Sequence, residues 1–72
     1  MLKLGKPTIR TFRGTYILRS EKLPSIGAKL YDKNKKPVAI VKDIFGPVSL
    51  PYIEVKPLTK KELNFVLYLK EK

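Results

Sequence analysis

The carboxylates are the residues of this chain best suited to acid–base chemistry, because its sequence contains no histidine and no cysteine. Six are present: Glu21, Asp32, Asp43, Glu54, Glu62 and Glu71. Catalysis by carboxylates needs a close pair whose pKa values are held apart, and no such pair stands out among the surrounding lysines and arginines. Histidine, the usual general base at neutral pH, is missing. We therefore predict that the protein is not an enzyme.

Metal and phosphate sites are also disfavoured by the sequence. Without cysteine there is no disulfide and no cysteine-based zinc site, and the carboxylate spacing matches no calcium-binding loop. The four glycines, at positions 5, 14, 27 and 46, are too dispersed for a glycine-rich phosphate loop. We predict no metal and no cofactor.

The charge balance favours an acidic partner. Sixteen Lys and Arg residues against six Asp and Glu give a net charge of +10, and a field of this size attracts nucleic acid or an acidic protein surface. Five basic residues lie in or near turns and would form one cationic patch for RNA phosphate if the turns shared an end of the fold: Arg10, Arg13, Lys33, Lys35 and Lys36. The alternative is a solvated face that serves solubility.

Aromatic residues that could stack on RNA bases form no recognisable platform. Tyr16, Tyr31 and Tyr68 are scattered through the chain, and we expect them to be half-buried strand residues rather than a base-stacking surface.

The loop between Phe45 and Tyr52 is the sharpest feature of the sequence. Its glycine and two prolines restrict the backbone, and a rigid apolar loop loses little conformational freedom on docking. Phe45, Val48, Leu50 and Tyr52 would form an aromatic and aliphatic patch typical of interface centres. The alternative is that Phe45 and Val48 close one end of the fold.

The length of 72 residues allows one domain, residues 1–72. No apolar run approaches the roughly 20 residues that span a bilayer, and the N-terminal residues lack the apolar stretch of a secretory signal. We expect a cytoplasmic protein without a membrane partner.

The spacing of apolar runs and turn residues predicts an all-β fold. Six strands are expected at 4–12, 15–19, 29–32, 38–45, 52–56 and 65–69, the first two as a hairpin, and together they suggest a small closed or nearly closed barrel. Leu23 and Ile26, in the loop of residues 21–27, are expected to pack back onto the core. Thr59 and Glu62 fit a capping box and predict one short helical turn before the last strand; a C-terminal helix over residues 59–72 is the competing interpretation.

Four segments together resemble one family. They are EKLPSIG at 21–27, LYD at 30–32, DIFGPV at 43–48 and PYIEVKP at 51–57. Their order and spacing over residues 3–69 resemble the GAR proteins of the box H/ACA ribonucleoprotein, in the tail-less form found in archaea. The stretch Phe45-Gly46-Pro47-Val48 is the most specific part.

The resemblance implies a six-stranded barrel similar to those of translation elongation factors. It also implies a non-catalytic accessory subunit of an RNA-guided pseudouridine synthase, which acts in rRNA pseudouridylation and ribosome biogenesis. Such a subunit binds the dyskerin-type catalytic subunit and modulates substrate RNA loading and product release. It meets guide and substrate RNA mainly indirectly, and it can form a homodimer in isolation. The alternative is a small basic barrel that binds RNA directly.

The same resemblance assigns partner contacts in this chain. They are Phe45, Gly46, Pro47, Val48, Pro51 and Tyr52, with Ile44 shared with the core and Leu23 and Pro24 as weaker candidates. Leu50 departs from the family pattern, which favours a polar residue there, and predicts a more apolar contact face.

Overall fold

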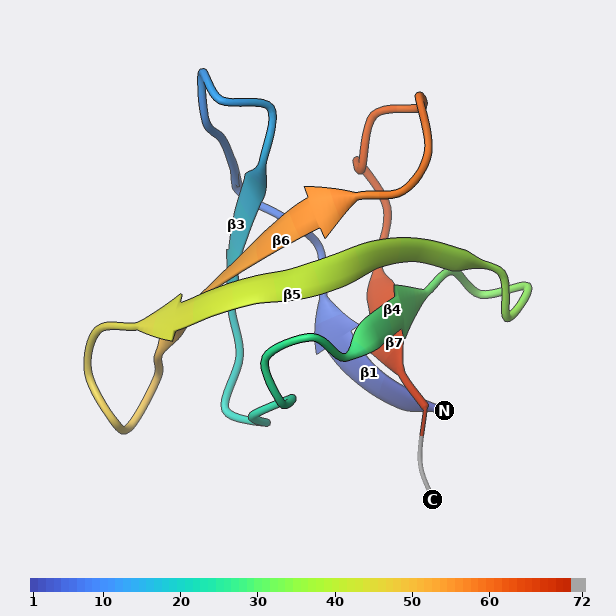
Figure 1. Cartoon of the computed structure of the whole chain (residues 1–72). Helices are drawn as coiled ribbons and strands as arrows, with labels where there is room; N and C mark the ends of the chain where they lie inside the picture. The colour runs from blue at the N-terminus through green and yellow to red at the C-terminus, as the bar shows by residue number, and fades with distance from the viewer. Residues whose placement is uncertain (71–72) are drawn as a thin grey trace.

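The computed structural model describes residues 1–70 as a single curled antiparallel sheet (Figure 1). Its strands are β1 Leu2–Gly5, β2 Ile9–Arg10, β3 Tyr16–Arg19, β4 Lys29–Tyr31, β5 Pro37–Phe45, β6 Tyr52–Pro57 and β7 Leu67–Leu69. The strand order is β1-β7-β4-β5-β6-β3-β2, so β1 and β2 form the two edges and the sheet curls into a half-barrel. Within residues 1–70, no helix is long and apolar enough to cross a membrane.

The predicted all-β, barrel-like fold is confirmed, but the predicted six strands and helical turn are wrong, first in the strand count. The expected first strand, residues 4–12, is divided into β1 and β2, which belong to opposite edges of the sheet. The ladder of β1 with β7 is irregular between Lys3 and Gly5, and Pro7 has no N–H to continue it. β2 then pairs with β3, so the expected hairpin forms only from Ile9 onward.

The helical turn before the last strand is also absent from the described chain. The Thr59 hydroxyl accepts a hydrogen bond from the Lys61 N–H at 3.3 Å, which closes a local turn two residues on. Glu62 does not reach back to Thr59 but pairs with Arg10 at 3.4 Å. A C-terminal helix is equally ruled out over residues 59–70, because β7 pairs with both β1 and β4.

The core lies on the concave side of the sheet and is closed by the segment between β6 and β7. It contains Leu4, Tyr16, Leu18, Leu30, Val38, Ala39, Val41, Ile53, Val55, Leu63 and Leu67. Strand alternation places Ile53 and Val55 of β6 together in this core. Burial of such side chains is worth roughly 1.5–3 kcal/mol each.

The prediction that the loop between β3 and β4 packs on the core through Leu23 and Ile26 is wrong. Leu23 and Ile26 are 58% and 64% exposed, whereas Pro24 is buried. The loop is held by its backbone instead: the Gly27 N–H donates to the Val41 carbonyl at 2.8 Å, and the Val41 N–H donates to the Ala28 carbonyl at 2.9 Å. These bonds use the backbone groups of the loop, and the side chains of Leu23 and Ile26 face solvent.

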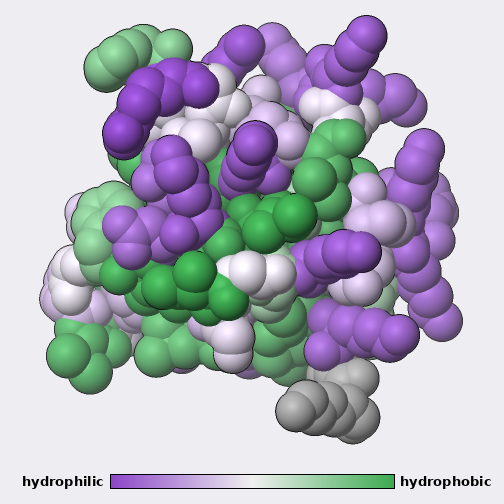
Figure 2. All heavy atoms as spheres, viewed as in Figure 1, coloured by the Kyte–Doolittle hydropathy of each residue, from purple (hydrophilic) through white to green (hydrophobic). Residues whose placement is uncertain are grey.

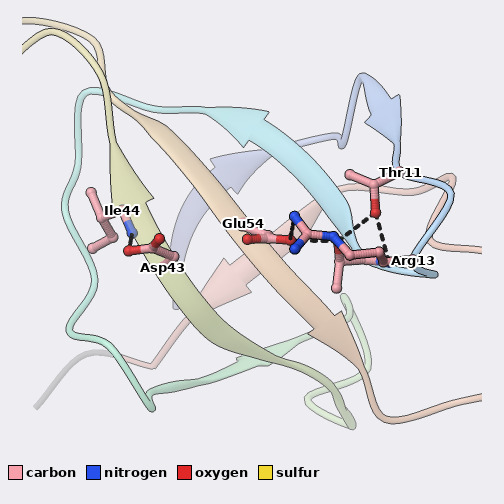
Figure 3. A network of polar contacts seen from close by, with 6 residues as sticks. Thr11, Arg13, Asp43, Ile44 and Glu54 are labelled. Atoms are coloured by element: carbon pink, nitrogen blue, oxygen red, sulfur yellow. Dashed lines mark hydrogen bonds and ion pairs between the residues drawn. The ribbon is translucent and has the colours of Figure 1, made fainter.

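A polar network ties the β2–β3 hairpin to β6 (Figure 3). Glu54 is 6% exposed, and its Oε2 accepts a hydrogen bond from the Thr15 hydroxyl at 2.6 Å. The Thr11 and Thr15 hydroxyls are 2.6 Å apart, and Arg13 approaches Glu54 at 3.6 Å. Because a buried carboxylate is costly without partners, this network fixes the position of the hairpin.

Candidate protein-binding surface

The β5–β6 hairpin carries the loop that the sequence singles out. β5 and β6 are the longest strands, and their ladder continues to the pair Phe45–Tyr52. The connecting residues 46–51 form the loop at the left of Figure 1, which extends beyond the remainder of the sheet. The hairpin therefore presents this loop on a hydrogen-bonded support.

A β-bulge explains why Phe45 faces outward. The ladder shifts between Val41 and Asp43, which pair with the neighbouring residues Val55 and Glu54. Val41 is buried, and strict alternation from it would turn Phe45 inward and Ile44 outward. The additional residue reverses this phase, so Ile44 packs against the core and Phe45 is 44% exposed. The Asp43 carboxylate accepts the Ile44 N–H at 2.8 Å within the bulge (Figure 3).

Aromatic and cationic groups make the base of the loop rigid. The rings of Phe45 and Tyr52 stack with centroids 5.5 Å apart and planes 20° apart. The Arg19 guanidinium lies 4.5 Å from the centroid of the Tyr52 ring and donates a hydrogen bond to the Leu50 carbonyl at 3.1 Å. Stacking and cation–π contacts each contribute about 0.5–1.5 kcal/mol. The loop therefore has a defined shape before any partner binds.

Gly46 is required by the same packing. Its φ is +95°, a region that L side chains rarely adopt, and a Cβ at this position would lie 2.8 Å from Cδ2 of Tyr52. The backbone can approach the tyrosine ring this closely only because residue 46 has no side chain.

The predicted contact residues fall into three groups by exposure. Val48, at the tip, is 92% exposed, and Phe45 is 44% exposed. Gly46 and Pro47 are also exposed. Tyr52 is half-buried, as is Leu50, the position that differs from the family pattern. Pro51 is buried, so its side chain supports the loop and does not form part of its exposed surface.

The exposed apolar surface extends beyond the β5–β6 loop: of the two weaker predicted contacts Leu23 is exposed and Pro24 is buried, and Ile26 is exposed as well. The β3–β4 loop is bonded to β5 at Val41, close to the bulge, and carries the exposed side chains of Leu23 and Ile26. Figure 2 shows hydrophobic side chains gathered at the lower left, over the region where Figure 1 draws the end of β5 and the β3–β4 loop. Ile26 was missed because apolar residues in loops usually fold inward. We call Leu23, Ile26, Phe45 and Val48 the apolar surface.

The five basic residues do not form one patch. Arg10 and Arg13 belong to the β2–β3 hairpin and pair with Glu62 and Glu54. The three lysines lie in the β4–β5 turn, at a different end of the molecule (Figure 1). The predicted union of these turns is therefore not present.

The three tyrosines that the sequence leaves scattered do not come together as one exposed platform in the described chain. Tyr16 is buried, and Tyr31 and Tyr68 are half-buried. Residues 1–70 contain no group of three or more carboxylates placed to hold a metal ion. The apolar surface is thus the feature most suited to recognition.

Comparison with known proteins places the chain among archaeal relatives. No protein-family model matches the sequence. An uncharacterized protein of Methanocaldococcus jannaschii is 40% identical over 62 residues, which cover 85% of this chain and 75% of the relative. The chain belongs to the family of this protein. An uncharacterized protein of Methanothermobacter thermautotrophicus is 37% identical over 57 residues, 79% of this chain but only 62% of the relative, which is therefore substantially longer than the matched part.

Proposed function

We propose that the protein is a non-catalytic accessory subunit of an archaeal box H/ACA pseudouridine synthase and binds its dyskerin-type catalytic subunit. The observation that carries the proposal is the outward-facing β5–β6 loop, in which Val48 is 92% exposed and the rings of Phe45 and Tyr52 stack at the base. Phe45 and Val48 belong to the stretch with the most specific resemblance to GAR proteins, and the relatives are archaeal.

The geometry of the loop suits a protein partner better than a small molecule. Val48 and Phe45 project apolar groups from a support that is already ordered, so docking costs little side-chain or backbone entropy. Leu23 and Ile26 enlarge the surface beside them. Apolar and aromatic anchors of this kind dominate the binding energy of protein interfaces.

In the proposed complex this subunit performs no chemistry. The guide RNA selects the target by base pairing, and the catalytic aspartate belongs to the dyskerin-type subunit. Docking of the β5–β6 loop on the catalytic domain would bias a mobile loop of that subunit, which changes substrate loading and product release. The absence of histidine and cysteine from the sequence agrees with this division of roles.

The proposal is tested by binding of this protein to a purified archaeal dyskerin-type subunit without RNA. We expect Val48→Glu and Phe45→Glu each to weaken binding at least about 100-fold in calorimetry, because a buried unpaired charge would replace an apolar anchor. Val48→Glu should leave the fold intact, since the side chain is 92% exposed.

The matched control is Phe12→Glu, which changes a fully exposed aromatic residue in the β2–β3 hairpin. It should bind as the unaltered protein does. Unchanged affinity in both loop variants would reject the assigned surface, and failure of the unaltered protein to bind at all would reject the function. Capture of the partner from an archaeal extract with and without nuclease separates a protein contact from an RNA bridge.

A further inference from the structure

A groove that contains no residue of the β5–β6 loop lies between the β4–β5 turn and the segment that joins β6 to β7. Its volume is about 680 Å³, within the range of ligand-binding sites. Asp32, Lys33, Asn34 and Lys36 line it on the turn side, and Thr59, Lys61, Glu62, Asn64, Phe65 and Val66 line it on the other.

The charge of the groove is cationic in effect. Lys33, Lys36 and Lys61 are exposed and take part in neither of the two ion pairs formed within residues 1–70. Both carboxylates of the lining have partners. Glu62 forms an ion pair with Arg10 at 3.4 Å. Asp32 accepts the backbone N–H groups of the β4–β5 turn at 2.8 and 3.0 Å. The lining thus carries three lysines against two carboxylates, one of which is paired with Arg10 from outside the lining, so the groove keeps a net positive charge.

The turn that carries two of these lysines is fixed in shape. Besides the bonds to the Asp32 side chain, the Asp32 N–H donates to the Lys36 carbonyl and the Lys35 N–H donates to the Asp32 carbonyl, both at 3.0 Å. The spacing of the Lys33 and Lys36 backbones is therefore set before a ligand binds.

The groove also offers aromatic surface beside these charges. Phe65 and Tyr68 line it, and both are half-buried, so each ring is held by the fold while part of it stays accessible. Asn34 and Asn64 add exposed amides. Lysines beside aromatic rings and amides match a phosphodiester followed by a base, because every base has a face that stacks on an aromatic ring.

We propose that this groove binds a short single-stranded polynucleotide. Phosphodiester groups lie at Lys33, Lys36 and Lys61, and one base lies against Phe65 and Tyr68. The groove and the β5–β6 loop are at different ends of the molecule (Figure 1), and Figure 2 shows hydrophilic side chains where Figure 1 draws the β4–β5 turn. The proposed site is therefore spatially separate from the apolar surface.

The test measures binding of fluorescent ten-nucleotide oligo(U) and oligo(dT) by anisotropy over a series of salt concentrations. We expect the double variant Lys33→Glu/Lys61→Glu to bind at least 10-fold more weakly than the unaltered protein. The slope of log K against log salt concentration should also become shallower by at least about 1.4, because two phosphate contacts worth about 0.7 each are lost.

The matched control is Lys22→Glu/Lys42→Glu, which makes the same charge change at two exposed lysines outside the groove. Its affinity for the oligonucleotides should fall by no more than about 3-fold. Equal losses in the two double variants, or no binding of either oligomer at 100 mM salt, would overturn the proposal. Binding of either oligomer with the expected difference supports it, and the preference between them identifies the sugar.

Amide chemical shifts provide the second measurement. Oligo(U) should shift the signals of Asn34, Thr59 and Asn64, and shifts confined to the β2–β3 hairpin would overturn the site. Polyglutamate carries negative charge but no bases. If it displaces oligo(U) at equal charge concentration, binding depends on charge alone and the base contact is rejected. Lys33→Glu/Lys61→Glu should still bind the dyskerin-type subunit, so the two proposals fail separately.

Discussion

Replacing Gly46 by alanine should destabilise the protein more than the same change at another glycine of positive φ. Gly46 has φ +95° and Gly14 has φ +85°, so alanine is conformationally strained at both positions. A Cβ at residue 46 would lie 2.8 Å from Tyr52 Cδ2, whereas a Cβ at residue 14 meets nothing within 4 Å. Gly14→Ala is therefore a control for the backbone strain alone.

The expected difference follows from the contacts of Tyr52. The strain of a positive φ costs about 1 kcal/mol in both variants. In Gly46→Ala the Tyr52 ring must also move, which weakens its stacking on Phe45 and its contact with Arg19. These two contacts are together worth about 1–3 kcal/mol, and a displaced ring keeps part of them, so the added loss is about 1–2 kcal/mol. Gly46→Ala should thus lose about 2–3 kcal/mol of unfolding free energy, and Gly14→Ala about 1.

Thermal unfolding followed by circular dichroism measures both losses. For a domain of this size 1 kcal/mol corresponds to about 4–8 °C in Tm, so the two variants should differ by several degrees. In a Tyr52→Ala background the additional cost of Gly46→Ala should disappear. Equal Tm values for Gly46→Ala and Gly14→Ala in the unaltered background would refute the packing of the ring on residue 46.

Two further changes test the core and the buried network. Thr15→Val removes the hydroxyl that donates to the buried Glu54 carboxylate at 2.6 Å, so urea denaturation should show a loss of about 1–3 kcal/mol, and Thr15→Ser should recover most of it. Leu18→Ala creates a cavity at a fully buried position of β3 and should cost about 2–5 kcal/mol, enough to broaden or abolish the cooperative unfolding transition of so small a domain; a loss below 1 kcal/mol would contradict the packing described.

Much of the strand arrangement could be predicted because it depends on local patterns. The glycine turn before β3, the apolar run that begins at Val38 in β5 and the alternation of Ile53 and Val55 in β6 each placed their strand within a few residues. The division of residues 4–12 was missed because both halves are extended, and only their pairing partners, β7 and β3, distinguish them. The capping box failed because Glu62 has a competing partner, Arg10, 52 residues away in the sequence.

The candidate surface was partly readable from the sequence. The composition of the β5–β6 loop indicated a rigid apolar turn, but it did not determine the direction in which Phe45 faces. A signal was available: Val41 and Ile44 are three residues apart, which a strand of period two cannot bury on one face without a bulge. The exposure of Leu23 and Ile26 depends on backbone bonds to β5, which composition does not encode.

The bulge at Val41–Asp43 also has a consequence for how relatives are aligned. A homologue one residue shorter here could form a regular ladder with the counterparts of Val41 and Ile44 still inside and that of Phe45 still outside. A deletion after Ile44 would instead turn the aromatic residue at the end of β5 to the opposite face of the sheet. Length variation is thus tolerable at one point of this hairpin and harmful two residues later. Alignments of distant family members should be judged by where their gaps fall as well as by their percentage identity.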